Sequence, residues 1–376
     1  MGFPDVTKAE LRGYNLYTEQ MDAATLAVII DKCVEEKILN EEFWAKFSWR
    51  TQQLINKVNE TEICYLFRGF SRRDWIDSHL LLSLWGRSDF LLPRISLEDA
   101  SVLLEGYSND HFFNKKYETR VLDHIEGLVT VRTDWTVSEL VKIASVLGYS
   151  SRLSRQDQAL FETRKRILSI VLSKVAEKPG DLFDVPGVTI AKTLASMSRL
   201  GVSDLPLVLC LTDELKDSGK LTTKQEENGF NSAVIALKAL TELNAIDVFP
   251  DLLIEYYDNI YRLSHDALVD MVGIAERLAS HLLPPDHLSV LLLRVSREIY
   301  KMEKSVVVQL LIELLTTNSV SEMHAECVGE CVDRLVETGV DGVPILDVLR
   351  ESINRAPKSL QSENLKKLGQ VVELVL

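Results

Sequence analysis

Long uncharged apolar segments are absent from this chain of 376 residues. A charged residue interrupts the longest apolar stretches well before the roughly 18 consecutive residues that a membrane-spanning helix needs. We therefore expect no membrane-spanning segment. The first 19 residues mix both charges, with Asp5 and Glu10 beside Lys8 and Arg12, so this segment is typical neither of a secretory signal nor of an acid-poor transit peptide.

Cysteine is also scarce, and the chain holds five: Cys33, Cys64, Cys210, Cys327 and Cys331. This number does not make a disulfide framework in a chain of this length, so we expect reduced thiols. Cys327 and Cys331 lie four residues apart on a predicted helix, shortly after His324, which raises the alternative of a metal site. A zinc site usually needs four ligands, and no second pair lies nearby. We predict a buried helix face without a metal.

Signatures of catalysis are missing as well. No Gly-rich segment has the spacing and the preceding strand that a phosphate-binding loop requires. The seven histidines are scattered, and carboxylate pairs such as Glu98 with Asp99 stand at expected helix starts, where the helix dipole accounts for them. The sequence gives no support for an enzyme, and we predict a non-catalytic protein with no catalytic residues and no cofactor.

What the chain does contain is a recurring block of helical length. A starter residue is followed by apolar positions four, seven and about ten residues later, and the starters are Asp22, Asn59, Ser96, Thr136, Pro186, Gly229, Ser264, Lys304 and Asp341. The intervals cluster near 37 residues, the length of one helical hairpin, and such hairpins bury a face only against their neighbours. The predicted fold is all-α, an α-solenoid of about nine helical hairpins with a period near 37 residues.

The block that begins at Asn59 shows the pattern most fully. Ile63, Leu66 and Gly69 follow the starter, and the block at Ser96 repeats the pattern up to Gly106. Apolar residues at this spacing line one face of a helix, and small residues at the end of the run let a neighbouring helix approach closely. We predict that five residues in the inward phase are buried between hairpins: Leu103, Leu140, Ile143, Leu268 and Leu311.

A second helix is expected in each block. We place these helices over residues 41–58, 75–92, 115–131, 155–176, 205–218, 248–262, 286–301, 321–338 and 359–376. Breakers such as Pro179-Gly180 and Pro284-Pro285 fall between the helices. No alternating apolar and polar run is long enough and β-branched enough to predict a strand.

The interval of 50 residues between Thr136 and Pro186 breaks the regular spacing. It contains an Arg- and Lys-rich stretch and the Lys178-Pro179-Gly180 break, and we interpret it as a flexure between two arms. The predicted organisation is an N-terminal extension (1–21), an N-terminal helical-repeat arm (22–178) and an acidic C-terminal helical-repeat arm (179–376). No segment is rich enough in Ser, Gly or Pro to form a long linker.

Charge is divided unequally between the arms. Of the net charge of −14, residues 1–180 contribute −2 and the remainder −12, while all five tryptophans lie in the first arm. This asymmetry suggests that the arms face different partners. The second arm is expected to attract basic segments of partner proteins through displayed carboxylates. The candidates are Glu226, Glu227, Asp251, Glu255, Asp258 and Asp266.

RNA binding is the alternative from another class. Helical-repeat stacks commonly read single-stranded RNA through successive first helices, and basic residues with interleaved aromatic residues suit phosphate binding and base stacking. The candidate contacts for RNA or another partner are Arg68, Arg72, Arg73, Arg152, Arg155, Arg164, Lys165 and Arg166. The sequence pI near 5.1 opposes nonspecific attraction to RNA, so salt-bridged solvated faces remain the favoured interpretation.

Two blocks carry a resemblance to a known group: Ser96-Leu-Glu-Asp-Ala-Ser-Val-Leu-Leu-Glu-Gly and Thr136-Val-Ser-Glu-Leu-Val-Lys-Ile-Ala-Ser-Val-Leu. They resemble the heptatricopeptide-type helical repeats of organellar RAP-domain and FAST-kinase-like proteins. The resemblance covers most of residues 22–376 and rests on helix phase and small residues rather than on an invariant motif. It implies a mitochondrial or plastid protein that acts on organellar RNA or belongs to a mitochondrial ribosome. We expect no RAP domain within these residues, because a single helix is predicted after Pro357.

These observations favour a non-catalytic helical-repeat scaffold subunit of a large mitochondrial assembly, with a mitochondrial ribosome as the first choice. An accessory subunit of a respiratory or ATP synthase complex is the alternative within this class, and an organellar RNA-binding factor is the alternative outside it. The expected partners are protein subunits of the complex, with a local RNA contact as a further expectation.

Overall fold

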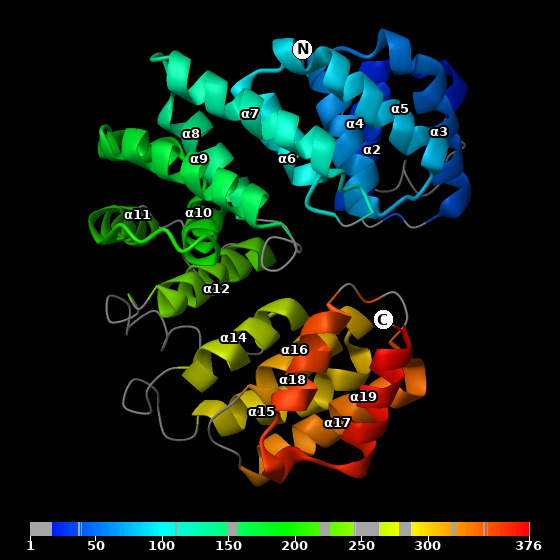
Figure 1. Cartoon of the computed structure of the whole chain (residues 1–376), viewed down its shortest axis with the longest axis vertical. Helices are drawn as coiled ribbons and strands as arrows, with labels where there is room; N and C mark the ends of the chain where they lie inside the picture. Colours follow the sequence, from blue (N-terminus) through cyan, green and yellow to red (C-terminus); the bar gives the residue numbers. More distant parts are fainter. Residues whose placement is uncertain are drawn as a thin grey trace. The chain divides into compact units, whose positions relative to one another are not determined.

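The computed structural model describes residues 17–36, 38, 40–109, 111–148, 157–217, 226–243, 245, 263–277, 287–316, 321–340, 343 and 345–375. These residues form 17 α-helices joined by turns and short 3-10 helices, and they contain no β-strand (Figure 1). The all-α prediction is confirmed. The second helix expected over 248–262 lies outside the described residues, as does most of the expected N-terminal extension.

The chain divides into two compact units, Met1–Asp181 and Leu182–Leu376. The boundary predicted after residue 178 lies close to this division. Among the described helices, none is both long and apolar enough to cross a membrane.

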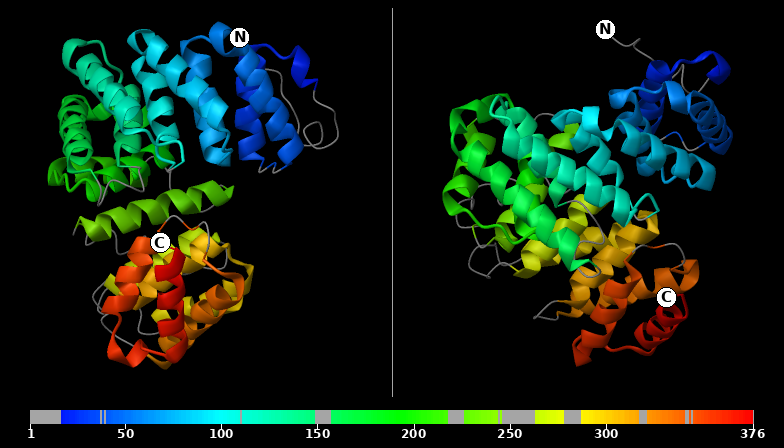
Figure 2. Two further views of the ribbon diagram at one scale, coloured as in Figure 1. Left: turned by 45° about the vertical axis from the view of Figure 1, so that its right-hand side comes forward. Right: turned by 45° about the horizontal axis from the view of Figure 1, so that its top comes forward.

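Unit 1 stacks four helical hairpins (Figure 2). Their first helices are α2 (Ala23–Glu35), α4 (Glu60–Arg73), α6 (Leu97–Gly106) and α8 (Val137–Leu147). Their second helices are α3 (Glu41–Leu54), α5 (Ser78–Leu91), α7 (Lys115–Val131) and α9 (Gln158–Ala176). Each first helix packs against the next first helix, and each second helix against the next second helix. We call these two sets the first-helix layer and the second-helix layer.

Unit 2 continues the same arrangement. Its first helices are α10 (Gly187–Arg199), α12 (Glu226–Glu242), α14 (His265–Arg277), α16 (Lys304–Leu315) and α18 (Leu346–Arg355). The second helices in the described part are α11 (Leu205–Asp217), α15 (His287–Glu298), α17 (Glu322–Thr338) and α19 (Glu363–Val375). Successive first helices again contact one another, as do α15, α17 and α19. The α-solenoid prediction is therefore confirmed.

Most of the predicted starters stand where the first helices begin. Five of them are N-cap residues: Asp22, Asn59, Ser96, Thr136 and Pro186. Asn59 and Thr136 form capping boxes with the Glu three residues later, which satisfies backbone N–H groups that the helix itself leaves unbonded. The local chemistry of the sequence therefore determines these helix starts.

The spacing of the first helices is not fixed at 37 residues. Their first residues are 37, 37, 40, 50, 39, 39, 39 and 42 residues apart. α12 begins at Glu226, before the predicted Gly229, because acidic residues suit the first turn of a helix. α18 begins at Leu346, after the predicted Asp341, because Pro344 disfavours helical backbone at the residue before it.

A repeated hydrogen bond ties the two helices of each of the first three hairpins together. Arg50 donates to the carbonyl of Met21, Arg87 to that of Val58, and His124 to that of Ile95. Each acceptor directly precedes the N-cap of a first helix. The bond therefore fixes the start of the first helix against the second helix of the same hairpin.

The residues predicted to lie between hairpins are buried. Leu103, Ile143, Leu268 and Leu311 have no exposed surface, and Leu140 is 2% exposed. The prediction that these repeat positions face the neighbouring hairpins and are buried is confirmed in both units. These side chains supply the apolar contact that each hairpin makes with its neighbours.

Close approach in the first-helix layer depends on glycine. A Cβ atom added at Gly69 of α4 would lie 2.3 Å from Cγ2 of Ile30 in α2, and one added at Gly106 would lie 2.4 Å from Cδ1 of Phe67. Both distances are far below van der Waals contact. The predicted role of these glycines as helix contacts is therefore confirmed.

We predict that Gly69→Ala destabilises the protein by about 1–3 kcal/mol, because the added methyl group overpacks the contact with Ile30. The matched control is Gly127→Ala in α7, where an added Cβ meets no atom within 4 Å. This control should gain about 0.5–1 kcal/mol from helix propensity. Urea denaturation followed by circular dichroism measures both changes. Equal stabilisation by the two substitutions would contradict the close approach of α2 and α4.

Candidate partner-binding surfaces

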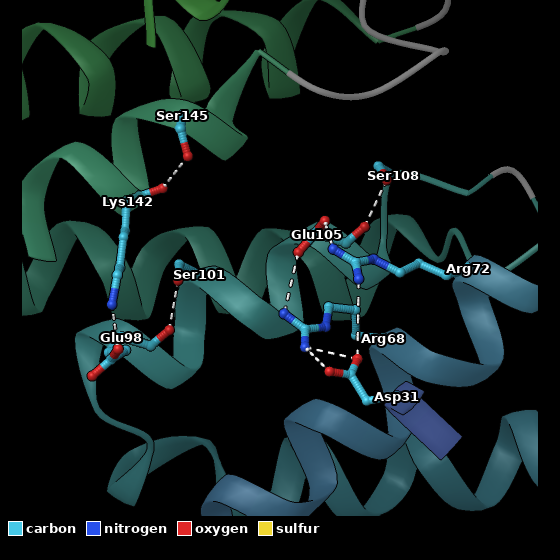
Figure 3. A network of polar contacts seen from close by, with 9 residues as sticks. All are labelled: Asp31, Arg68, Arg72, Glu98, Ser101, Glu105, Ser108, Lys142 and Ser145. Atoms are coloured by element: carbon cyan, nitrogen blue, oxygen red, sulfur yellow. Dashed lines mark hydrogen bonds and ion pairs between the residues drawn. The ribbon is translucent and has the colours of Figure 1, made fainter. Parts of the chain in front are cut away.

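The first basic candidates belong to an ion-pair network in the first-helix layer of unit 1. Figure 3 shows Arg68 of α4 between Asp31 of α2 and Glu105 of α6. Its Nη2 lies 2.8 Å from Oδ1 of Asp31, and its Nη1 lies 3.6 Å from Oε2 of Glu105. Arg72 donates to Glu105 at 2.6 Å. Asp31, Arg68 and Glu105 each stand nine residues after a starter, so charges alternate along one repeat position.

A further pair extends this network to the last first helix of unit 1. Lys142 of α8 contacts Glu98 of α6, and both side chains remain partly exposed. The pair joins the surfaces of neighbouring hairpins, as the contacts of Arg68 do (Figure 3). All four first helices of unit 1 are therefore connected by opposite charges.

Unit 2 contains an equivalent network. Lys238 of α12 lies 2.6 Å from Asp270 of α14 and 3.5 Å from Glu313 of α16. The contact with Glu313 crosses α14 at Gly273, where an added Cβ would lie 2.7 Å from the Glu313 carboxylate. Burial disfavours the charge on Lys238, but the attraction of Asp270 and Glu313 outweighs it and raises the pKa of Lys238 above its usual value. Arg277 adds contacts of 3.1 Å to Glu242 and to Glu313.

The remaining basic candidates lie in different surroundings. The half-buried Arg73 places its guanidinium 5.8 Å from the centre of the Trp44 ring. Arg166 of α9 donates two hydrogen bonds to Glu126 of α7, at 2.7 and 2.8 Å, and Lys165 beside it is half-buried. Arg152 and Arg155 lie outside the described residues. The structure therefore does not gather the eight candidates into one basic surface in the part that it describes.

Arg164 was predicted as an RNA or partner contact, and this prediction is wrong. Its side chain is 0% exposed, pairs with Glu118 of α7 and donates to the carbonyl of Leu147 at 2.8 Å. Three consecutive basic residues on a helix cover more than half of its circumference, so one of them must face the packed side. Arg164 therefore joins α9 to α7 and α8 inside the unit.

The acidic candidates of the second arm are described only in part. Asp251, Glu255 and Asp258 lie outside the described residues, as do the side chains of Glu226 and Glu227 at the start of α12. Asp266 is exposed in the first turn of α14. The acidic surface predicted for this arm therefore stays a prediction.

The His and Cys cluster near the end of unit 2 is part of the core. Cys327, Cys331 and His324 are buried, as predicted for this helix face. His324 donates from Nε2 to the carbonyl of Leu314 at 2.8 Å, and burial raises the pKa of the Cys327 thiol to about 12. Within the described residues, no three His, Cys, Asp or Glu side chains are placed to hold a metal ion together.

A groove of about 340 Å³ lies on the first-helix layer between α2 and α4. We call it the α2/α4 groove, and it is lined by Ala24, Ala27, Val28, Asp31, Lys32, Glu35, Thr61, Glu62 and Tyr65. Small apolar residues and an aromatic ring are combined with three carboxylates and a single ammonium group. This lining suits a basic side chain with an apolar stem.

A second groove, of about 440 Å³, lies on the second-helix layer. It lies where α5 meets the 3-10 helix η2 (Ile55–Lys57), which directly follows α3, and we call it the α3/α5 groove. Its lining residues are Ile55 and Asn56 of η2 and Leu82, Ser83, Gly86, Arg87 and Phe90 of α5. Leu82 and Phe90 are 64% and 68% exposed. Sequence reasoning missed this surface, although α5 carries apolar residues on more than one face, which is the signal of a second apolar contact.

No protein family model matches the chain, and no curated protein matches it in sequence.

We predict that Arg164→Ala costs about 3–5 kcal/mol, because it leaves the buried carboxylate of Glu118 without its counter-charge. The double variant Arg164→Met with Glu118→Leu should recover most of this loss, since it removes both charges and retains the volume. Urea unfolding of the three proteins measures the difference. A small effect of Arg164→Ala would mean that Arg164 is not held in the core.

Proposed function

We propose that this chain is a non-catalytic helical-repeat scaffold subunit of a large mitochondrial assembly, foremost a mitochondrial ribosome, and that it binds other protein subunits. The α-solenoid fold supports this proposal, because stacked hairpins offer long surfaces for protein contacts. The resemblance of the Ser96 and Thr136 blocks to heptatricopeptide-type repeats supports the mitochondrial setting.

The observation that carries the choice of protein over RNA is the neutralisation of the cations in the first-helix layer. Arg68 and Arg72 contact Asp31 and Glu105, and Lys142 contacts Glu98. A surface that binds RNA needs cations that are available for phosphate groups, since phosphate contacts supply most of the nonspecific affinity. A surface that binds protein has no such need.

The α2/α4 groove supports a protein partner with basic residues. Asp31, Glu35 and Glu62 line it, and among the described residues Lys32 is the only cation in the lining. Asp31 is paired with Arg68, Glu35 lies 3.5 Å from Lys32, and Glu62 accepts a hydrogen bond from the Asn59 backbone, so a basic side chain would share these carboxylates with their present partners. Tyr65 and the small residues of α2 offer apolar surface to the stem of a Lys or Arg side chain. Electrostatic attraction of this kind guides association and weakens with salt.

We predict that Glu35→Lys weakens co-sedimentation of the tagged chain with its companion proteins, because it reverses a charge at the α2/α4 groove. Glu35 ends α2, where the helix dipole favours a cation, so the fold should tolerate the change. The matched control is Glu177→Lys at the exposed C-cap of α9, outside the groove. Sedimentation followed by identification of the companions, with and without ribonuclease, makes the measurement.

The same preparation tests the alternative. Purified wild-type chain should bind single-stranded RNA no more tightly than the roughly 10⁻⁴ to 10⁻⁶ M that is typical of nonspecific contacts at physiological salt. Tighter binding, or companions that all disappear after ribonuclease treatment, would favour an RNA-binding factor. Companions that are not mitochondrial would contradict the assembly proposed here.

A further inference from the structure

The α3/α5 groove has two exposed apolar side chains with an unobstructed glycine between them. Leu82, Gly86 and Phe90 follow one another at intervals of four residues, so they form a stripe along two turns of α5. Leu82 and Phe90 are each about two-thirds exposed, and an added Cβ at Gly86 would meet no atom within 4 Å. Two large anchors on either side of a glycine leave room for the side chains of another helix.

Arg87 places an available positive charge beside this stripe. Its Nε and Nη2 donate to the carbonyl of Val58 at 3.2 and 2.6 Å, and its guanidinium lies 5.3 Å from the centre of the Phe90 ring. A carbonyl carries no compensating charge, and no carboxylate in the described part of the chain lies within ion-pair distance of Arg87. Arg68, Arg72 and Arg166 differ, since each is paired with a carboxylate.

The charged groups around the groove leave an excess of positive charge. Lys57 is exposed next to the lining residue Asn56. Asp89 of α5 is paired with Arg120 of α7, and Glu60 is paired with Arg94 at 3.6 Å. Among the residues that the structure describes, no acidic one lines the groove. The lining is therefore complementary to an apolar segment that carries carboxylates.

We propose that the α3/α5 groove binds an acidic amphipathic helix of a partner protein, with apolar side chains between Leu82 and Phe90 and a carboxylate on Arg87. The Val58 carbonyl already orients the guanidinium, so less side-chain entropy is lost when the carboxylate binds. The stripe spans the distance between anchors four and eight residues apart on a bound helix. This inference rests on the proposed scaffold function and adds the chemistry of one partner.

The test begins with photo-cross-linking of the full chain in cells. A p-benzoylphenylalanine in place of Leu82 should cross-link to a partner segment in which Asp or Glu lies within one helical turn of the apolar anchors. The same residue in place of Val131, which is 80% exposed at the end of α7, provides the control position. Mass spectrometry of the cross-linked peptide identifies the segment.

The recovered segment is then synthesised, and its affinity is measured by fluorescence anisotropy. Arg87→Gln retains a donor for the Val58 carbonyl but removes the charge, and we expect a loss of affinity of roughly tenfold or more. The matched control is Arg50→Gln. Arg50 makes the equivalent hydrogen bond to the carbonyl of Met21 in the preceding hairpin, and it is not a lining residue of the groove. This control should leave the affinity unchanged, while Leu82→Ala with Phe90→Ala should lower it by roughly 30-fold or more.

Several results would overturn the inference. In the cross-linking experiment, these are a cross-link from position 82 to RNA, to a second copy of this chain or to a basic segment, or a signal no stronger than that from position 131. In the anisotropy experiment, it is an equal loss of peptide affinity for Arg87→Gln and Arg50→Gln. Failure here is distinguishable from failure of the scaffold proposal. Co-sedimentation with companion proteins would persist if only the groove inference were wrong, whereas its absence would contradict the scaffold even if the peptide bound.

Discussion

Close packing between successive first helices is the constraint on which the rest of this structure depends. Gly69 lets α2 and α4 approach, and the same approach brings Asp31 within reach of Arg68. In unit 2, Gly273 leaves space for the Glu313 carboxylate, so that Lys238 pairs across α14. Partly exposed ion pairs contribute at most about 1 kcal/mol each, whereas burying a leucine contributes about 1.5–3 kcal/mol. Apolar packing therefore supplies the stability, and the alternating charges disfavour a shifted register.

The arginines of the two layers of unit 1 have different partners, and this difference follows from the packing. In the first-helix layer, Arg68, Arg72 and Lys142 form ion pairs with carboxylates on neighbouring hairpins. Few cations of this layer therefore remain available to an external anion. In the second-helix layer, Arg50 and Arg87 bind main-chain carbonyls instead, which fixes their position without cancelling their charge. The difference arises because the second helices face the carbonyls that precede each first helix. Arg87 therefore keeps its positive charge in the second-helix layer, whereas Arg68 and Arg72 are paired with carboxylates in the first-helix layer.

The sequence predicted the stacking of hairpins because its information is local. N-caps such as Asn59 and inward residues such as Leu103 can be read from one helix alone. The partners of Arg68 lie about 37 residues away on either side, and their pairing depends on how closely the helices approach. The sequence therefore favoured salt-bridged faces for the basic candidates but could not name their partners. The prediction that Arg164 contacts RNA or a partner was wrong for the same reason, since its counter-charge Glu118 lies 46 residues away. The α3/α5 groove was missed because it needs two second helices placed side by side.

Because each hairpin packs only against its neighbours, a bound partner can directly stabilise only the interfaces that it contacts. In a repeat protein each hairpin contributes its own stability and that of its two interfaces. A ligand that contacts both η2, which follows α3, and α5 therefore stabilises the interface between the first two hairpins directly. Helices further along the unit respond only through the interfaces between them. If the α2/α4 groove binds a basic segment and the α3/α5 groove an acidic one, as we propose, the two segments would occupy different layers and would not compete for one surface. The proposed scaffold would then hold two unlike partners on the first two hairpins.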